Sequence, residues 1–360
     1  MATEHKHGGN PFADLARLNL PETKIIDFSV NLNPLGMPDI INRNWGSLID
    51  AVQDYPSIDG RGITDFYAHK TGISPDEFLA GNGSTELIYL IPRVLKFKKV
   101  LIPAPSFYDY ERASVLAGAE VVTYPLRPEN NFALPSAREL ETVINNVDAI
   151  WAGRPNNPTA GMFKRDTIIY LREKYPDKYF IIDEAFIQFI DDWKDESLIS
   201  YNRYSNLIII HSFTKFYSIA GLRMGGIIGH RDTIGQLKEH KEPWTVNGIA
   251  EKAALLLKDC EDYEAATMKY LTSERERVFG ILKEMGGIEV FPSCTNFFLC
   301  RWKITDNLDD LIAYLLKNGI FIRDCRNFRG LEDNYFRLSI RSVEDNNRLL
   351  SLLSSFGKHK

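Results

Sequence analysis

The sequence predicts an α/β fold, with a mostly parallel sheet in a large domain and a smaller C-terminal α+β domain. Short apolar runs recur roughly 20 to 30 residues apart, with helix-like stretches between them, and this pattern changes after Asn247. The runs are apolar throughout, as strands covered on both faces of a sheet require. A chain of 360 residues, 44% of them hydrophobic, is long enough to bury such a core.

Six apolar runs are expected to form the large sheet: Val100–Ile102, Val121–Thr123, Ala149–Ala152, Tyr179–Ile182, Leu207–Ile210 and Gly226–Gly229. Helical stretches over 248–257 and 261–285 then lead to strand-like pieces at Asn296–Cys300, Ile320–Ile322 and Tyr335–Ile340. The first 40 residues are rich in Asn, Pro and Gly and look extended. We therefore expect an N-terminal arm over 1–40 that packs on the small domain, a large domain over 41–247 and a small domain over 248–360.

Composition excludes several classes of protein. The formal net charge of −5 argues against a general nucleic-acid binder. No apolar stretch reaches the roughly 20 residues that span a bilayer, and no signal-peptide-like run opens the chain, so we expect a cytoplasmic enzyme without a membrane partner. The four cysteines form no CxxC pair, which indicates reduced thiols and no metal site.

Polar side chains follow the apolar runs where ligands of parallel sheets collect. Asp183 follows the fourth run. Lys215 follows the fifth, with Ser212 and Thr214 just before it and Arg223 eight residues further on. A carboxylate or lysine beside a strand is often only a cap or a surface charge. Here one amine nucleophile stands among several anion ligands, which suits a Schiff-base lysine beside a bound phosphate.

A glycine-rich turn precedes a helical stretch at Gly83, Ser84 and Thr85. Backbone N–H groups at a helix N-terminus, together with two hydroxyls, can bind a phosphate. The same residues also suit a plain turn and helix cap. The turn matches neither the GxGxxG motif nor a Walker sequence. It therefore argues against a binding site for a dinucleotide or a nucleoside triphosphate.

Two further strand ends complete a ligand site. Asn157 follows the third run between prolines, and Phe107 follows the first run and offers a ring for stacking. Together the strand ends suit one ligand. Its planar ring would stack on an aromatic side chain, with a ring substituent at Asn157 and a cationic ring nitrogen at Asp183. Its phosphate would bind the hydroxyls and Arg223, and its aldehyde would react with Lys215. That ligand is pyridoxal phosphate, although ordinary core packing is an alternative for the aromatic ring.

The chain resembles the fold-type-I pyridoxal-phosphate enzymes, and within them the histidinol-phosphate aminotransferase branch. The segment Ser212–Arg223 (SFTKFYSIAGLR) is the most specific signal, and Asn156–Thr159, Asp183–Phe186 and Tyr335–Ile340 follow the family's order and spacing. The segments His7–Asn10 and Asp27–Gly36 are similar to phosphoamino-acid decarboxylases of corrinoid biosynthesis.

Two positions depart from the aminotransferase pattern. Phe186 stands where the aminotransferases typically carry a tyrosine that bonds the cofactor's 3′-oxygen, which fits a changed reaction. Ala160 stands where a glycine usually follows Asn-Pro-Thr, so the loop there is expected to differ.

The resemblance implies roles for individual residues. Lys215 and Asp183 would be catalytic, as the cofactor-bound amine and the partner of the ring nitrogen. Tyr55 is similar to the tyrosine that reaches the phosphate from the neighbouring subunit, which implies a homodimer. The cofactor-binding set is Gly83, Ser84, Thr85, Phe107, Asn157, Asp183, Ser212, Thr214, Lys215, Arg223 and Tyr55.

The C-terminal part is suited to an anionic substrate. Phe321 to Arg348 contains six arginines and no lysine, and guanidinium forks suit carboxylates and phosphates. By resemblance Arg337 would bind the substrate carboxylate and Arg323 and His7 its phosphate, with Asn33 and Asn157 orienting it. Arg326, Arg348 and Arg329 are expected to be ordinary surface arginines.

The activity that the resemblance implies is decarboxylation of L-threonine O-3-phosphate to (R)-1-aminopropan-2-yl phosphate and CO2. L-serine O-phosphate is an alternative substrate, because one methyl group is worth only about 1 to 3 kcal/mol in a pocket. A histidinol-phosphate-type aminotransferase and a non-catalytic small-molecule-binding protein are the remaining alternatives.

Overall fold

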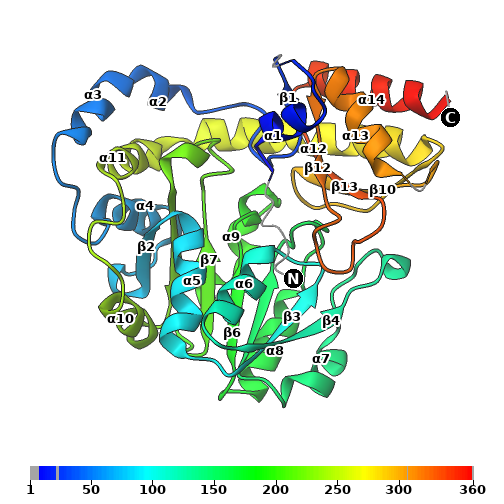
Figure 1. Ribbon diagram of the computed structural model, residues 1–360. Coiled ribbons are helices and arrows are strands. Elements are labelled where there is room, and N and C mark those ends of the chain that lie inside the picture. Colours follow the sequence, from blue (N-terminus) through cyan, green and yellow to red (C-terminus); the bar gives the residue numbers. More distant parts are fainter. Residues whose placement is uncertain (1–7, 22–23, 306, 359–360) are drawn as a thin grey trace.

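The computed structural model describes residues 8–21, 24–305 and 307–358. Within these ranges one large sheet has the strand order β2-β8-β7-β6-β5-β3-β4 (Figure 1). The strands are β2 (Phe78–Asn82), β3 (Lys99–Ala104), β4 (Glu120–Pro125), β5 (Ala149–Gly153), β6 (Tyr179–Asp183), β7 (Leu207–His211) and β8 (Met224–Gly229). β8 pairs in antiparallel fashion with both β2 and β7, and the other described pairs of this sheet are parallel, which confirms the predicted mostly parallel sheet.

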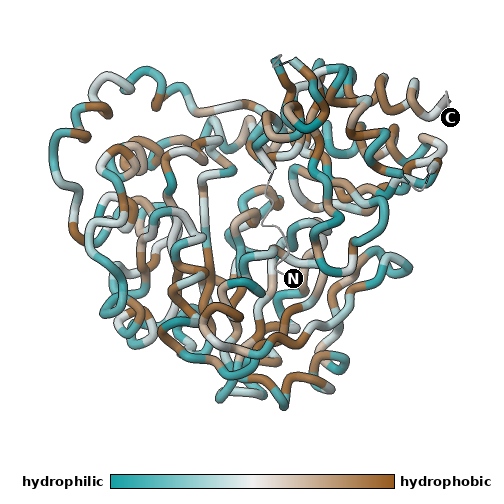
Figure 2. Tube along the Cα trace, viewed as in Figure 1, coloured by the Kyte–Doolittle hydropathy of each residue, from teal (hydrophilic) through white to brown (hydrophobic). Residues whose placement is uncertain are grey.

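Both faces of the large sheet are buried. Along β7, Ile209 belongs to one hydrophobic cluster, while Ile208 and Ile210 belong to another. Figure 2 shows hydrophobic residues along these central strands. The helices in this part of the chain are α4 (Arg61–Thr71), α5 (Gly83–Leu95), α6 (Tyr108–Leu116), α7 (Ala137–Ile144), α8 (Arg165–Lys174), α9 (Trp193–Glu196), α10 (Arg231–Glu239) and α11 (Gly248–Leu256).

The C-terminal part builds a second sheet with antiparallel pairings. Its strand order is β12 (Arg323–Asp324), β13 (Tyr335–Ser339), β10 (Phe297–Trp302) and β9 (Ile288–Val290). The helices α12 (Glu261–Glu284), α13 (Leu308–Lys317) and α14 (Val343–Lys358) accompany it. The long α12 reaches from the large sheet to the small one (Figure 1), and Tyr217 donates a 2.6 Å hydrogen bond to Glu264 near its start.

The arm is less extended than the sequence indicated. It contains α1 (Pro11–Arg17), which has Pro11 in its first turn, Asp14 near its positive end and Leu15 buried. The short β1 (Ile26–Asp27) pairs in parallel with β11 (Ile320–Phe321) of the C-terminal part, and α2 (Asp39–Arg43) and α3 (Trp45–Ile49) follow. The division of the chain at residues 40 and 247 stays a prediction.

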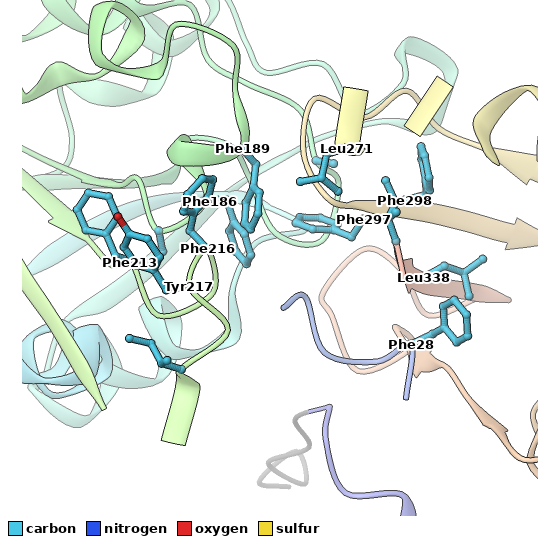
Figure 3. Close-up of a cluster of buried hydrophobic side chains, with 14 of the residues drawn as sticks. Phe28, Phe186, Phe189, Phe213, Phe216, Tyr217, Leu271, Phe297, Phe298 and Leu338 are labelled. Atoms are coloured by element: carbon cyan, nitrogen blue, oxygen red, sulfur yellow. The ribbon is translucent and has the colours of Figure 1, made fainter. Parts of the chain in front are cut away.

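Buried aromatic side chains connect the parts of the fold. Figure 3 shows Phe186, Phe189 and Phe216 beside Phe297, with Phe28 further along the same apolar region. The rings of Phe186 and Phe297 meet edge to face with centroids 5.1 Å apart. This contact joins the loop after β6 to the first residue of β10, so the end of the large sheet and the small sheet are packed against each other.

Candidate active site

A pocket lies at the carboxyl ends of the central parallel strands. This edge is where open α/β sheets place their ligands. The pocket is lined by Ser84, Thr85, Phe107, Tyr110, Pro155, Asn157, Asp183, Ala185, Phe186 and Lys215. Six of the residues predicted from the sequence to bind the cofactor therefore meet in one cavity.

Lys215 lies on the loop that follows β7. Its Nζ is 5.2 Å from the centre of the Phe186 ring, and its carbonyl oxygen accepts a 3.0 Å hydrogen bond from the N–H of Asn33. Burial lowers the pKa of the amine, and the nearby Asp183 carboxylate acts in the opposite direction. A lowered pKa favours the neutral, nucleophilic form of a lysine.

Asp183 is the last residue of β6, and its carboxylate is held at both oxygens. The hydroxyl of Tyr110 donates to Oδ2 at 2.7 Å, and the backbone N–H of Ala185 donates to Oδ1 at 2.9 Å. Burial raises the pKa of this carboxyl, while Lys215, Tyr110 and the Ala185 N–H lower it. The site therefore contains a buried, oriented carboxylate able to hold a cationic nitrogen.

The glycine-rich turn forms the start of α5, against Arg223. Gly83 has φ +74°, and a Cβ placed on it would lie 2.4 Å from a guanidinium nitrogen of Arg223. A Cβ on Gly225 would lie 2.6 Å from the backbone nitrogen of Ser84. Glycine at both positions lets the helix N-terminus and the guanidinium approach each other, which suits a phosphate.

Two hydroxyls predicted for the same phosphate lie on the lysine loop. The side chains of Ser212 and Thr214 are buried and hydrogen-bonded to each other at 2.8 Å. Ser212 also contacts the carbonyl oxygen of Met224, next to Arg223, at 3.4 Å. The loop and the arginine are thus connected, although neither hydroxyl lines the pocket itself.

Arg337 brings a buried cation to the site from β13. Its guanidinium donates to the carbonyl oxygen of Ser29 at 2.8 Å and to the side-chain oxygen of Asn157, while its Nε has no hydrogen-bond partner. Within the described ranges it forms no ion pair, and burial lowers its pKa to about 10. A buried guanidinium of this kind is suited to the anionic group of a ligand.

Arg323 lies directly opposite Arg337 in the pairing of β12 with β13. Its Nη2 donates to Asn327 at 2.9 Å, and its guanidinium carbon lies 5.1 Å from the centre of the Phe328 ring. Both arginines are less than a tenth exposed. Two buried guanidinium groups on neighbouring strands offer binding sites for two anions.

The two arm asparagines differ in a way that the sequence could not show. The amide of Asn33 donates to the carbonyl oxygen of Phe216 at 2.7 Å and to Thr267 at 2.8 Å, so it is used within the protein. Asn31 is also buried, but its Oδ1 has no hydrogen-bond partner. In the sequence, Asn31 stands between Ser29, which contacts Arg337, and Asn33, which contacts Lys215. Asn31 is therefore a candidate site residue that we did not predict.

Tyr55, which the resemblance places in the cofactor site, is not among the residues that line the pocket of its own chain. Tyr55 is 86% exposed and contacts Trp244, with ring centroids 5.6 Å apart. His7 lies outside the described residues. Ala160, the second departure from the family pattern, is buried with φ +58°, a conformation that explains why a glycine is the usual residue there.

The fold and the site define a member of a known family. The chain belongs to the class I and II aminotransferases, whose family model matches residues 23–353. Pyridoxal 5′-phosphate is the cofactor of this family, which confirms the cofactor predicted from the sequence. The buried amine, the oriented carboxylate and the glycine cradle beside Arg223 fit that group.

Three proteins similar to this chain show which members of the family it resembles. The chain is 36% identical to a Caldanaerobacter subterraneus protein provisionally named a threonine-phosphate decarboxylase, over 90% of this chain and 88% of the relative. It is 32% identical to the threonine-phosphate decarboxylase of Salmonella typhimurium, over 96% and 95%. The histidinol-phosphate aminotransferase structure from Clostridium acetobutylicum is 31% identical with a TM-score of 0.85, over 92% of this chain and 99% of that one.

The structure also bears on membrane association. In the parts of the chain that are described, every helix is too short or too polar to cross a bilayer.

Proposed function

We propose that this protein is a pyridoxal-phosphate-dependent decarboxylase of L-threonine O-3-phosphate, with CO2 and (R)-1-aminopropan-2-yl phosphate as products. The observation that carries the proposal is the pair of buried arginines, Arg323 and Arg337, on neighbouring strands beside the lysine pocket. The substrate carries a carboxylate and a phosphate, and each guanidinium can bind one of them. The names of the two curated relatives support the same substrate.

The cofactor-binding residues divide into three groups by chemistry. The start of α5 at Gly83, Ser84 and Thr85 binds the phosphate together with Arg223, and Ser212 and Thr214 support it. Phe107 and Asn157 hold the ring, and Asp183 holds the ring nitrogen in its protonated form. When bound, pyridoxal phosphate accepts the electron pair left at the substrate's α-carbon as the carboxylate departs.

Lys215 has two tasks in this proposal. Its amine holds the cofactor covalently until the substrate arrives, and it then carries a proton to the α-carbon that has lost CO2. Burial suits the amine to both tasks, because it lowers the pKa and so makes proton uptake and release easier near neutral pH.

The proposed substrate contacts come from the arm and from β12 and β13, together with Asn157. Arg337 and Asn157, already in contact with each other, bind the carboxylate end. Arg323 and His7 bind the phosphate end. We propose Asn31 in place of Asn33 as the arm residue that contacts substrate, because the Asn33 amide is already used within the protein. The two anion contacts fix which bond of the α-carbon is turned toward cleavage.

We also propose that the protein acts as a homodimer. Apolar side chains are exposed around the loop that carries Tyr55, namely Trp45, Ile49, Val52, Ile58, Trp244 and Leu255. Such a patch is typical of a protein interface. In a dimer Tyr55 would reach the partner's cofactor phosphate, and light scattering of the purified protein tests the stoichiometry.

The four free cysteines support a reducing, cytoplasmic location.

A comparison of substrates tests the proposed activity. The purified holoenzyme is incubated with L-threonine phosphate, with L-serine phosphate, and with histidinol phosphate plus 2-oxoglutarate. We expect the amine product from threonine phosphate, less from serine phosphate, and no glutamate. Glutamate formation from histidinol phosphate would instead indicate a histidinol-phosphate aminotransferase, and the solved structure of one such enzyme is 31% identical to this chain. Lys215→Ala serves as the inactive control.

A further inference from the structure

Tyr110 donates a hydrogen bond to the carboxylate of Asp183, a contact that we did not predict from the sequence. Its hydroxyl is 2.7 Å from Asp183 Oδ2, and both side chains are buried. The second oxygen, Oδ1, receives the Ala185 N–H at 2.9 Å. A carboxylate offers about four lone-pair positions, so these two donors fix its plane and leave the other positions for the pocket.

The position of Tyr110 is itself tightly constrained. Its ring stacks on Trp151 of β5, with centroids 5.2 Å apart and an angle of 14° between the planes, and meets the edge of Phe107 at 5.5 Å. Its carbonyl oxygen accepts a 2.8 Å hydrogen bond from Ser114, one turn along α6. The hydroxyl is therefore held by packed rings on two elements and is not free to rotate away from Asp183.

The hydrogen bond also affects the charge of Asp183. Burial disfavours the carboxylate form and raises its pKa, and the Tyr110 hydroxyl opposes that effect. The phenol remains protonated, because burial and the Asp183 charge hold its own pKa well above the usual value. Tyr110 can therefore only donate to the carboxylate, and it does so in a medium where charge-assisted hydrogen bonds are strong.

We propose that Tyr110 is a positioning residue that acts through Asp183, fixing the carboxylate and keeping it charged so that it holds the cofactor's ring nitrogen protonated. The proposal rests on the role proposed for Asp183, but it does not depend on the substrate or on decarboxylation. Removal of the hydroxyl makes the carboxylate a stronger base, so the shared proton moves from the ring nitrogen toward Asp183.

The test is the ¹⁵N chemical shift of ring-labelled pyridoxal phosphate in the holoenzyme, together with the rate of cofactor dissociation. Tyr110→Phe keeps the stacked ring and removes only the donor. We expect its ¹⁵N signal to move toward that of unprotonated pyridine, and the cofactor to dissociate about tenfold faster. An unchanged signal and an unchanged dissociation rate would overturn the proposal.

Three further proteins make the result specific. Tyr89→Phe is the matched control, because Tyr89 donates a 2.6 Å hydrogen bond to Asp109 outside the pocket, and we expect it to match the wild type. An equal shift in Tyr89→Phe would contradict a specific role for Tyr110. Asp183→Asn tests the role assigned to Asp183, since an unchanged ¹⁵N signal in that variant would refute it.

If Tyr110→Phe does not fold, 3-fluorotyrosine at position 110 decides the question. A stronger donor should keep the nitrogen at least as protonated and slow cofactor loss, and faster loss would count against the proposal.

Discussion

The N–H of Asn33 donates a hydrogen bond to the carbonyl oxygen of Lys215 at 3.0 Å. Four residues earlier, the carbonyl oxygen of Ser29 accepts a 2.8 Å hydrogen bond from Arg337. The arm thus connects Lys215, on the loop after β7 of the large sheet, with Arg337 on β13 of the small one. Asn31 lies midway along this span of the sequence, and its side chain is buried with an Oδ1 that has no hydrogen-bond partner.

This arrangement predicts different effects for two asparagine variants. Asn33→Ala removes two buried hydrogen bonds and should lower the free energy of unfolding by about 2 to 4 kcal/mol. Asn31→Ala should change stability by less than about 1 kcal/mol but raise KM for threonine phosphate about tenfold. Urea unfolding and steady-state kinetics distinguish them. If Asn33→Ala raised KM at unchanged stability, the assignment of the two residues would be reversed.

Gly83→Ala should weaken cofactor binding. The added Cβ would lie 2.4 Å from Arg223, at a backbone φ of +74° that disfavours any side chain. We expect the dissociation constant for pyridoxal phosphate to rise at least about tenfold, measured by titration of the apoenzyme. Gly235→Ala in α10 is the control, because a Cβ there meets no atom within 4 Å. Equal affinities for the two variants would argue against a close turn at the phosphate site.

Arg337→Lys should impair substrate binding more than cofactor binding. Lysine keeps the positive charge but loses the planar fork that can hold a carboxylate with two hydrogen bonds. We expect KM for threonine phosphate to rise about 10- to 100-fold, with cofactor affinity within twofold of the wild type. Arg348→Lys, at an exposed site on α14, should leave both quantities unchanged. If Arg337→Lys weakened only cofactor binding and left KM unchanged, Arg337 would contact the cofactor and not the substrate.

Because His211 is buried, we expect the free energy of unfolding to fall in acid. It is fully buried beside Tyr67, Gln188 and Trp193, and burial lowers its pKa to about 3 from the ordinary 6.5. The unfolded chain takes up a proton below pH 6.5 that the folded chain does not. The free energy of unfolding should therefore fall by about 1.4 kcal/mol per pH unit between these values, in addition to the effect of other groups.

His211→Asn isolates this contribution. The variant should be less stable at pH 7, but its stability should fall less steeply than that of the wild type between pH 6 and pH 4. Urea unfolding of the apoenzyme at each pH measures the two slopes. Parallel curves would mean that His211 does not titrate as its burial implies.

Much of the fold could be predicted because the sheet's strands are uniformly apolar. All six predicted runs lie in strands β3 to β8, but β2 was missed, since Phe78–Asn82 merges with the glycine-rich turn that follows it. The helix α1 was missed because Asn, Pro and Gly around it suggested an irregular arm. A seven-residue helix whose buried residues are only Pro11 and Leu15 leaves little periodic signal in a sequence.

The site was less predictable where it depends on tertiary contacts. Lys215 and Asp183 stand at strand ends, so the sheet itself brings them together. Nothing in the segment Asn31-Leu32-Asn33 shows which amide is used by the protein, because that depends on Phe216 and Thr267, far away in the chain. The role of Tyr110 likewise required the contact between α6 and the end of β6.

The most direct test of the account is the amount of CO2 released per L-threonine phosphate consumed, with purified holoenzyme and no 2-oxo acid present. We expect one CO2 and one (R)-1-aminopropan-2-yl phosphate per substrate molecule over many turnovers, and none with Lys215→Ala. Consumption that requires a 2-oxo acid and transfers the amino group to it without CO2 release would contradict the account.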